Sequence, residues 1–137
     1  MRAVLDPNVI ISATLSAWGP PGRLLRLWID GAYDLVVSPQ LLAEVDRALR
    51  YPKLRDRIPT EDKDRLLELL STGGIEIEDP ETLPEVRSSD PDDDYLIALA
   101  SISRSVLVSG DTDLLELSPR IPVFSPAQFL SEIEHVY

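Results

Sequence analysis

The alternation of short apolar strands with helical segments is the feature of this sequence that most limits its fold. Five short apolar runs predict strands at Ala3–Asp6, Leu35–Ser38, Ile75–Glu78, Val106–Ser109 and Val123–Ser125. Apolar residues spaced three and four apart predict helices at Asn8–Leu15, Gly22–Asp30, Gln40–Arg50, Glu61–Leu70, Asp92–Ser103 and Ala127–Glu134, with a short turn at Leu114–Leu117. Strands that alternate with helices predict a parallel sheet covered on both faces.

Residues that cap or end helices support these boundaries. A capping side chain precedes a proline in Ser38-Pro39, Asp90-Pro91 and Ser125-Pro126, and proline suits the first helical turn because its missing N–H would be unpaired there anyway. Gly31 and the pair Gly73-Gly74 are predicted to end helices. The polar segment Asp79–Ser89 is predicted to be a surface connection.

Composition narrows the class of protein. The chain has 137 residues, 44% of them hydrophobic, so we expect a single domain over residues 1–137. No apolar tract reaches the roughly 18 residues of a membrane span, and no secretory signal pattern opens the chain, so we expect it in the cytoplasm. With no cysteine and one histidine, a Cys/His zinc site is excluded, and any metal would be bound by oxygen, as magnesium, manganese and calcium are.

Acidic residues outnumber basic ones by 24 to 13, which gives a net charge of −11. This excess argues against a broadly basic surface for nucleic acid, so the positions of the acids carry the information. Asp6 ends the first predicted strand, and Asp111 follows the fourth. The functional crevice of an open parallel sheet lies at the carboxyl ends of its strands, where these two residues are expected to meet.

Further acids are expected at the same edge. Asp90, Asp92, Asp93 and Asp94 open the helix before the fourth strand, and Glu44 lies about one turn into the helix after the second. Each has an ordinary alternative, because Asp90 and Asp113 can cap helices and Glu44 can be a solvated residue. Two negative charges about 4 Å apart repel by roughly 4 kcal/mol at an effective dielectric near 20. Converging carboxylates therefore favour a divalent cation, and with it phosphodiester hydrolysis.

Several motifs, in order along nearly the whole chain, resemble those of PIN domains, and among them the VapC-like group of toxins from toxin–antitoxin pairs. Val4–Val9 resembles the family's Asp-Thr-Asn-Val opening, and Ala17–Gly22 its Gly-Pro-Pro turn. Val36–Val45 is similar to its VVSPxxLxEl segment. Asp90–Leu96 looks like DPxDxxFL, and Ser109–Leu115 looks like SGDxDLL.

The resemblance implies a three-layer α/β/α sandwich with a central five-stranded parallel sheet and an acidic pocket for Mg²⁺ or Mn²⁺. It implies catalytic roles for Asp6, Glu44, Asp93 and Asp111, and metal binding by Asp6, Asp93, Asp111 and Asp113. Asn8 and Ser109 match supporting polar positions, and Asp94 is the alternative to Asp93. The implied activity is that of an endoribonuclease, with RNA as substrate, an antitoxin protein as possible partner, and a homodimer as the assembly.

Two features leave alternatives open. Pro7 replaces the hydroxyl residue that commonly follows the family's first aspartate, which removes an N–H and keeps a non-catalytic RNA-binding or partner-binding scaffold as the alternative function. Arg47, Arg50 and Lys53 form part of a basic stretch that could bind substrate phosphates, or could pair with acids of the same helix.

Overall fold

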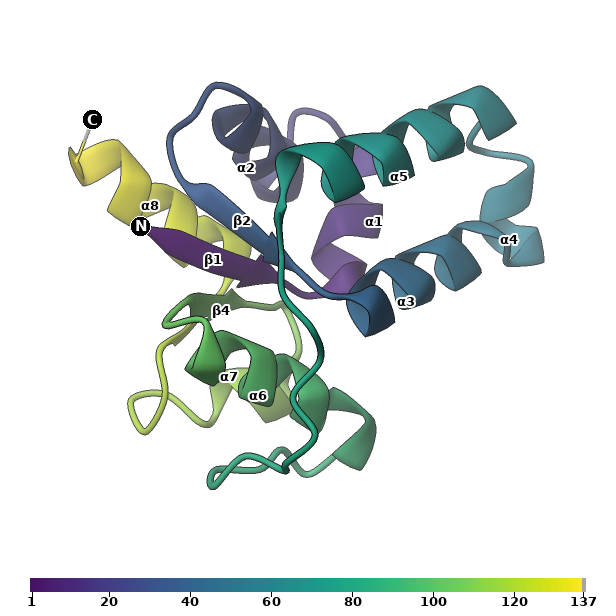
Figure 1. The fold of residues 1–137 in the computed structure, drawn as a ribbon. Helices are drawn as coiled ribbons and strands as arrows, with labels where there is room; N and C mark the ends of the chain where they lie inside the picture. Colours follow the sequence, from purple (N-terminus) through teal and green to yellow (C-terminus); the bar gives the residue numbers. More distant parts are fainter. Residues whose placement is uncertain (137) are drawn as a thin grey trace.

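The computed structural model describes residues 1–136, apart from the side chains of Arg55, His135 and Val136. Five strands form one sheet: β1 (Arg2–Leu5), β2 (Asp34–Val37), β3 (Ile75–Glu76), β4 (Val106–Val108) and β5 (Val123–Phe124). Neighbouring strands are all parallel, in the order β3-β2-β1-β4-β5 (Figure 1). The five-stranded parallel sheet expected from the sequence is confirmed.

The helices follow the expected alternation. They are α1 (Pro7–Leu15), α2 (Pro20–Ile29), α3 (Pro39–Leu49), α4 (Pro52–Arg55), α5 (Thr60–Gly73), α6 (Asp94–Ile102), α7 (Thr112–Leu115) and α8 (Pro126–Val136), with a single 3₁₀ turn, η1 (Pro91–Asp93). The predicted helix boundaries differ from these by a few residues. The four-residue α4 is an addition, and η1 with α6 replaces the one helix expected from Asp92.

The strand order reverses direction at β1. From β1 the chain moves outward through β2 to β3, and it then returns to the other side of β1 to form β4 and β5. Because parallel crossovers are right-handed, the helices of these two excursions cover opposite faces of the sheet. The contacts agree, since α1 packs with α2 and α3, whereas α6 packs on β1 and β4. The crevice expected at such a reversal therefore lies between the ends of β1 and β4.

Side-chain caps fix several helix starts. Ser38 Oγ accepts the Leu41 N–H at 3.2 Å, and Ser125 Oγ accepts the Gln128 N–H at 3.1 Å. Each such cap satisfies an N–H that has no partner inside the helix, which contributes about 1 kcal/mol. Asp6, Asp90 and Asp111 cap their helical turns through the N–H two residues ahead. Three acids of the predicted pocket region thus also have a structural role.

The core lies on both sides of β1, β2 and β4 and extends into α2. Leu24 and Trp28 of α2 are buried, and Leu25 and Leu27 are partly buried against the same core. Gly73 of α5 lies against the Trp28 ring, because a Cβ added at Gly73 would be 3.2 Å from Trp28 Cζ2. These apolar residues of α2 therefore pack against the core of the same chain.

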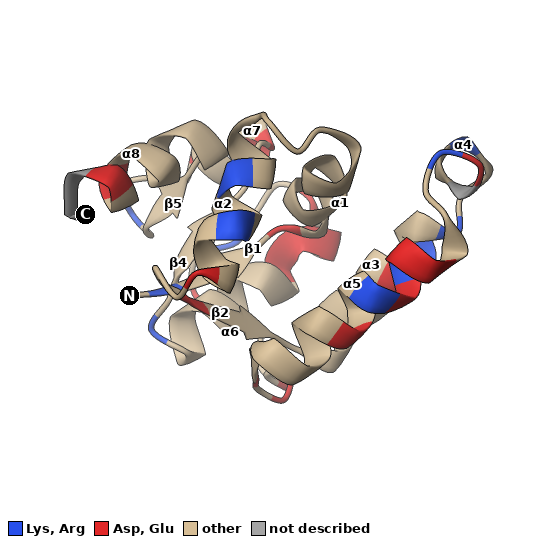
Figure 2. Ribbon diagram, turned by 90° about the horizontal axis from the view of Figure 1, so that it is seen from above, with Lys and Arg blue, Asp and Glu red and all other residues tan. Residues whose placement is uncertain are grey.

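Helices α3 and α5 pack along each other, and with α4 they extend to one side of the sheet as an arm (Figures 1 and 2). The arm begins close to the carboxyl end of β2, because Ser38 and Pro39 connect that strand directly to α3. None of the helices among residues 1–136 combines the length and apolarity that crossing a membrane requires.

Candidate functional site

Asp6 lies where β1 passes into α1, and its carboxylate is held on both oxygens. Oδ1 accepts the Asn8 N–H at 3.0 Å, and Oδ2 accepts the Ser109 hydroxyl at 2.8 Å. The residue is 5% exposed. Burial raises the pKa of Asp6, the two hydrogen bonds oppose this, and the charge of Asp111 adds to the increase. Pro7 occupies the first position of α1, where an N–H has no helical partner, so Asp6 keeps two donors despite it.

The turn after β4 brings Asp111 to the same place. Ser109 is fully buried, and its Oγ both donates to Asp6 and accepts the Asp111 N–H at 3.0 Å. Asp111 Oδ1 in turn accepts the Asp113 N–H at 3.0 Å, which starts α7. Asp113 is exposed, and its charge is not among those that raise the pKa of Asp6 or of Asp93. One serine therefore connects the two aspartates that end β1 and β4.

Asp93 completes the group from the start of α6. Burial raises the pKa of Asp93 to about 7, and the charges of Asp6, Asp90 and Asp111 add to this. Asp111 also acts on Asp93 as a side-chain hydrogen-bond partner, which raises the pKa of Asp93 further. Every charge that contributes to the raised pKa of Asp93 is negative. The carboxylates therefore repel one another, and a bound cation would reduce this repulsion.

Asp94 faces a different part of the chain from its neighbour. Its Oδ1 accepts the Ser88 N–H at 2.8 Å, and the residue is 6% exposed. It thereby fixes the end of the 79–89 connection against α6. The structure brings Asp93, and not Asp94, into contact with Asp111.

Glu44 is linked to the group through Tyr95, a residue for which the sequence predicted no role. Tyr95, the second residue of α6, donates its hydroxyl to Glu44 Oε2 at 2.7 Å. The pKa of Tyr95 is raised by burial, by this bond, and by the charges of Glu44, Asp6 and Asp79. Its position after three consecutive aspartates was the available signal, but Glu44 lies 51 residues away and cannot be paired with it from sequence alone.

Asp79 is a second residue of this region for which the sequence predicted no role. Its Oδ2 accepts the Gln40 N–H at the start of α3, at 2.9 Å. Its Oδ1 is buried and, among the described residues, has no hydrogen-bond partner. A buried carboxylate oxygen without a donor is costly to leave unpaired. Asp79 therefore adds a further unsatisfied acceptor near Tyr95.

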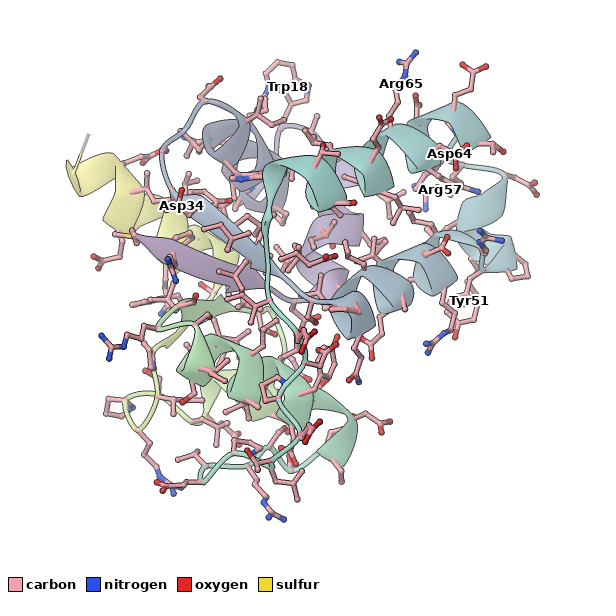
Figure 3. All side chains as sticks on the ribbon, viewed as in Figure 1. Trp18, Asp34, Tyr51, Arg57, Asp64 and Arg65 are labelled. Atoms are coloured by element: carbon pink, nitrogen blue, oxygen red, sulfur yellow. The ribbon has the colours of Figure 1, made fainter. Side chains whose placement is uncertain are left out.

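The basic residues proposed for substrate binding lie on the arm. Arg47 and Lys53 are exposed, and Arg50 pairs with Asp46 one turn earlier, with Nε 2.9 Å from Oδ1. Arg50 and Lys53 lie toward the α4 end of the arm, away from β1 and β4 (Figure 2). Tyr51 and Arg57 mark that end in Figure 3. The structure thus separates Arg50 and Lys53 from the aspartates, and Arg50 follows the pairing alternative.

The chemistry of these side chains fits an oxygen-preferring cation, because every candidate ligand is a carboxylate. Their placement does not complete the expected pocket, since no three acidic side chains in residues 1–136 are grouped closely enough to hold a metal ion. Asp93 and Asp111 are close enough to share a hydrogen bond, and Asp6 reaches Asp111 through Ser109. The structure therefore holds a carboxyl pair with a third aspartate linked to it.

Comparison with known proteins identifies relatives of the whole fold. The chain is 30% identical over 146 aligned positions to an uncharacterized protein, MJ1680, of Methanocaldococcus jannaschii, with 98% of this chain and 92% of that one covered. It superposes on the crystal structure of PAE2754 from Pyrobaculum aerophilum with a TM-score of 0.68 and 18% identity, over 98% and 90% of the two chains.

A second solved structure is VapBC2 from Rickettsia felis, bound to a DNA fragment from the promoter. The TM-score is 0.61 and the identity 12%, over 91% of this chain and 98% of that one. At such identities both superpositions describe the fold alone. A sequence model of the PIN domain matches residues 2–113, a range that contains Asp6, Glu44, Asp93 and Asp111. PIN domains are in general nucleases that use divalent metals, and this chain belongs to the PIN-domain family.

Proposed function

We propose that this protein is a metal-dependent endoribonuclease that hydrolyses phosphodiester bonds of RNA. The observation that carries the proposal is the contact between Asp93 and Asp111 beside Asp6, at the carboxyl ends of β1 and β4. A raised pKa in a group of like charges is typical of functional carboxylates. Together with membership of a nuclease family, this favours phosphodiester cleavage over other roles for the acids.

Different residues of the site have different proposed roles. Asn8 N–H and Ser109 Oγ hold Asp6 in one orientation, and Ser109 also positions Asp111. The carboxyl group of Asp93, whose pKa is raised, would ionise on binding a cation. Tyr95 fixes Glu44 at the edge of the crevice, where its carboxylate can accept a proton.

Asp6, Asp93 and Asp111, with Asp113 as a further member, would bind Mg²⁺ or Mn²⁺, which prefer oxygen ligands. When bound, such an ion supplies an activated water and neutralises charge that develops on the phosphate. Asp94 is already used by the Ser88 N–H, which favours Asp93 as the ligand. Exposed cations of the arm, Arg47 and Lys53 above all, would contact RNA phosphates away from the reacting bond.

We further propose that the protein is the toxin of a type II toxin–antitoxin pair and forms a homodimer. The support is the shared fold with VapBC2 of Rickettsia felis, a complex that was solved on promoter DNA. Exposed Trp18, in the turn before α2, and exposed Ile29, the last residue of α2, give apolar surface for a second copy or an antitoxin.

The proposal is tested by cleavage of an end-labelled panel of single-stranded RNAs in Mg²⁺ or Mn²⁺. Cleavage should stop with chelator and with Asp6→Asn, and it should persist in Asp92→Asn, which changes an exposed acid of η1 in the same way. The melting temperature should rise with added Mn²⁺ in the wild type and not in Asp6→Asn, which gives a readout independent of activity. Cleavage that survives Asp6→Asn would overturn the assignment of Asp6.

The alternative is a PIN-fold scaffold that binds RNA or a protein without cutting. It is favoured by the absence, in the described part of the chain, of three grouped acids. RNA binding without cleavage, together with no stabilisation by Mn²⁺, would establish the scaffold. Stabilisation by Mn²⁺ without cleavage of any tested RNA would instead mean a substrate more restricted than the panel.

A further inference from the structure

A cavity of about 440 Å³ lies at the opposite end of the sheet from the aspartates, between α6 and the first residues of β1 and β4. Its wall is mainly apolar and is formed by Ile97, Ala100, Val106, Leu107, Ile121 and Pro122. The volume falls in the range of roughly 300–1,000 Å³ that small-molecule sites occupy. The cavity is therefore large enough for the apolar body of a small organic molecule.

Two arginines, Arg2 and Arg104, also line this cavity. Arg2 Nη1 donates to the Ser103 carbonyl at 3.3 Å, which fixes its guanidinium beside the end of α6. The ion pairs within residues 1–136 involve neither arginine, and none joins Arg2 to Asp34, its neighbour across the β1–β2 ladder. Both arginines are exposed. In a chain with 24 acidic residues, two cations that line one cavity and have no ion-pair partner among the described residues are complementary to an anion from outside.

The backbone of Arg104 gives an independent indication. Helix α6 ends in a Schellman motif, in which the Arg104 and Ser105 N–H groups donate to the Ser101 and Ala100 carbonyls at 3.2 and 2.8 Å. The motif needs a left-handed residue, usually glycine, and here Arg104 adopts φ of +55°. A positive φ in a residue with a long side chain carries strain and suggests a role for that side chain.

Helix α2 ends in the same motif, which provides an internal comparison. The Gly31 and Ala32 N–H groups donate to the Trp28 and Leu27 carbonyls, both at 2.9 Å, and Gly31 has φ of +88°. The chain thus uses glycine where only the turn is needed. At the cavity it has arginine in the equivalent position, although glycine would adopt that conformation more readily.

We propose that this cavity binds a small organic anion, with its apolar body against Ile97 and Leu107 and its acidic group between Arg2 and Arg104. The site is separate from the aspartates and its chemistry differs from that of the proposed nuclease. The C-terminal end of α6 carries a partial negative charge, so an anion would be repelled here without the two guanidinium groups. Its ligand class is a carboxylate, sulfonate or phosphate that carries an apolar group.

The test uses anilinonaphthalene sulfonate as the probe and its uncharged analogue N-phenylnaphthylamine for comparison. Binding of each probe to the full chain is measured by fluorescence titration. We expect saturable binding of one sulfonate probe per chain, weakened by salt. Arg104→Gly should weaken it about tenfold, as expected for loss of one hydrogen bond to a charged group, while its melting temperature stays the same or rises. Arg104→Lys should retain most of the affinity, and the uncharged analogue should not distinguish these variants.

Two further variants make the test specific. Arg65→Ala removes the same charge from α5, on the far side of the molecule (Figure 3), and should leave binding unchanged. Ser101→Trp places a large side chain from the exposed Ser101 into the cavity wall and should abolish binding of both probes. Equal affinity of wild type, Arg104→Gly and Ser101→Trp would overturn the proposal. A change of oligomeric state in Ser101→Trp, without loss of probe binding, would show that this face joins two copies of the chain instead.

Discussion

At the carboxyl ends of β1 and β4 three aspartates interact with one another, whereas at the amino ends of the same strands two arginines flank an apolar cavity. The contrast follows from the topology. Helices that follow parallel strands begin at the carboxyl edge, so Asp6, Asp93 and Asp111 stand at positive helix N-termini. Arg104 follows the negative C-terminal end of α6 at the other edge. The chain path therefore places these three aspartates and these two arginines at opposite edges of the sheet.

The largest expected effect lies at the acidic edge. Asp93→Asn should lower the rate of RNA cleavage about a thousandfold, equivalent to roughly 4 kcal/mol of transition-state stabilisation. Asp92→Asn, one residue earlier and exposed, should keep nearly full activity. Single-turnover cleavage of one RNA by both variants makes the measurement. Equal losses would mean that the acidic run acts only through its total charge.

A serine at each end of β4 allows the two edges to be compared directly. Ser109→Ala removes the hydroxyl that joins Asp6 to Asp111, and should reduce metal affinity and activity about 10-fold to 100-fold, as loss of a ligand's supporting bond does. Ser105→Ala removes a hydroxyl that, among the described residues, shares a hydrogen bond with Ser103 Oγ at 2.7 Å and with neither aspartate. It should lower stability slightly and leave cleavage intact. Similar activity in the two variants would contradict the separation of the edges.

The pH dependence of stability should expose the repulsion at the acidic edge. The pKa of Asp93 is raised from 3.8 to about 7 in the folded protein, so folding favours its protonated form. The raised pKa of Asp93 stabilises the folded protein fully below about pH 4, and this stabilisation is lost as the pH rises toward 7. Asp93→Asn should therefore raise the melting temperature at pH 8 and have little effect at pH 4. Added Mn²⁺ should have the same effect on the wild type at pH 8, and identical pH profiles of wild type and variant would refute this account.

Tyr95 should act as a positioning residue with a smaller effect. Tyr95→Phe deletes the 2.7 Å bond to Glu44 and should lower kcat about threefold to tenfold, since one hydrogen bond to a charged group is lost. A double-mutant cycle with Glu44→Gln separates this contact from a general packing loss. Additive effects in the cycle would show that the two residues act independently.

The smallest effect is expected on the arm. Arg50→Ala removes an exposed pair with Asp46 and should change the free energy of unfolding by about 0.5 kcal/mol or less. If the arm contacts RNA, KM for a long substrate should rise about twofold at low salt, with kcat unchanged. Combined replacement of Arg47, Arg50 and Lys53 sharpens the measurement. An unchanged KM in the triple variant would remove the arm from the substrate path.

The sequence predicted the elements well where local signals are strong. Strands such as Leu35–Ser38 are short apolar runs beside a capping serine, and the structure places β2 within one residue of that prediction. The turn α4 was missed because the four residues Pro52–Arg55 are too few to show a helical period. Local patterns therefore located elements that are long or well capped.

The site was predicted less completely, because its contacts join distant segments. Asp6 and Asp111 were expected to meet since both follow adjacent parallel strands, and Ser109 does join them. The choice between Asp93 and Asp94 depends on helix phase at the junction of η1 and α6, which the sequence leaves open by one residue. The contact between Glu44 and Tyr95 and the direction of the arm depend on tertiary packing alone. The sequence alone therefore could not show on which surface the basic residues Arg47, Arg50 and Lys53 would lie.

The two tryptophans occupy opposite extremes of solvent exposure, and this provides an optical assay without added labels. Trp28 is 7% exposed and lies against Gly73, so its emission depends on whether α2 and the arm stay docked. Trp18 is 82% exposed (Figure 3) beside the guanidinium of Arg26, 4.9 Å from the ring centroid. In Trp18→Phe the remaining fluorescence reports loosening of the arm, while in Trp28→Phe it reports binding at the α1–α2 turn. The same chain can thus be followed separately for internal motion and for surface association.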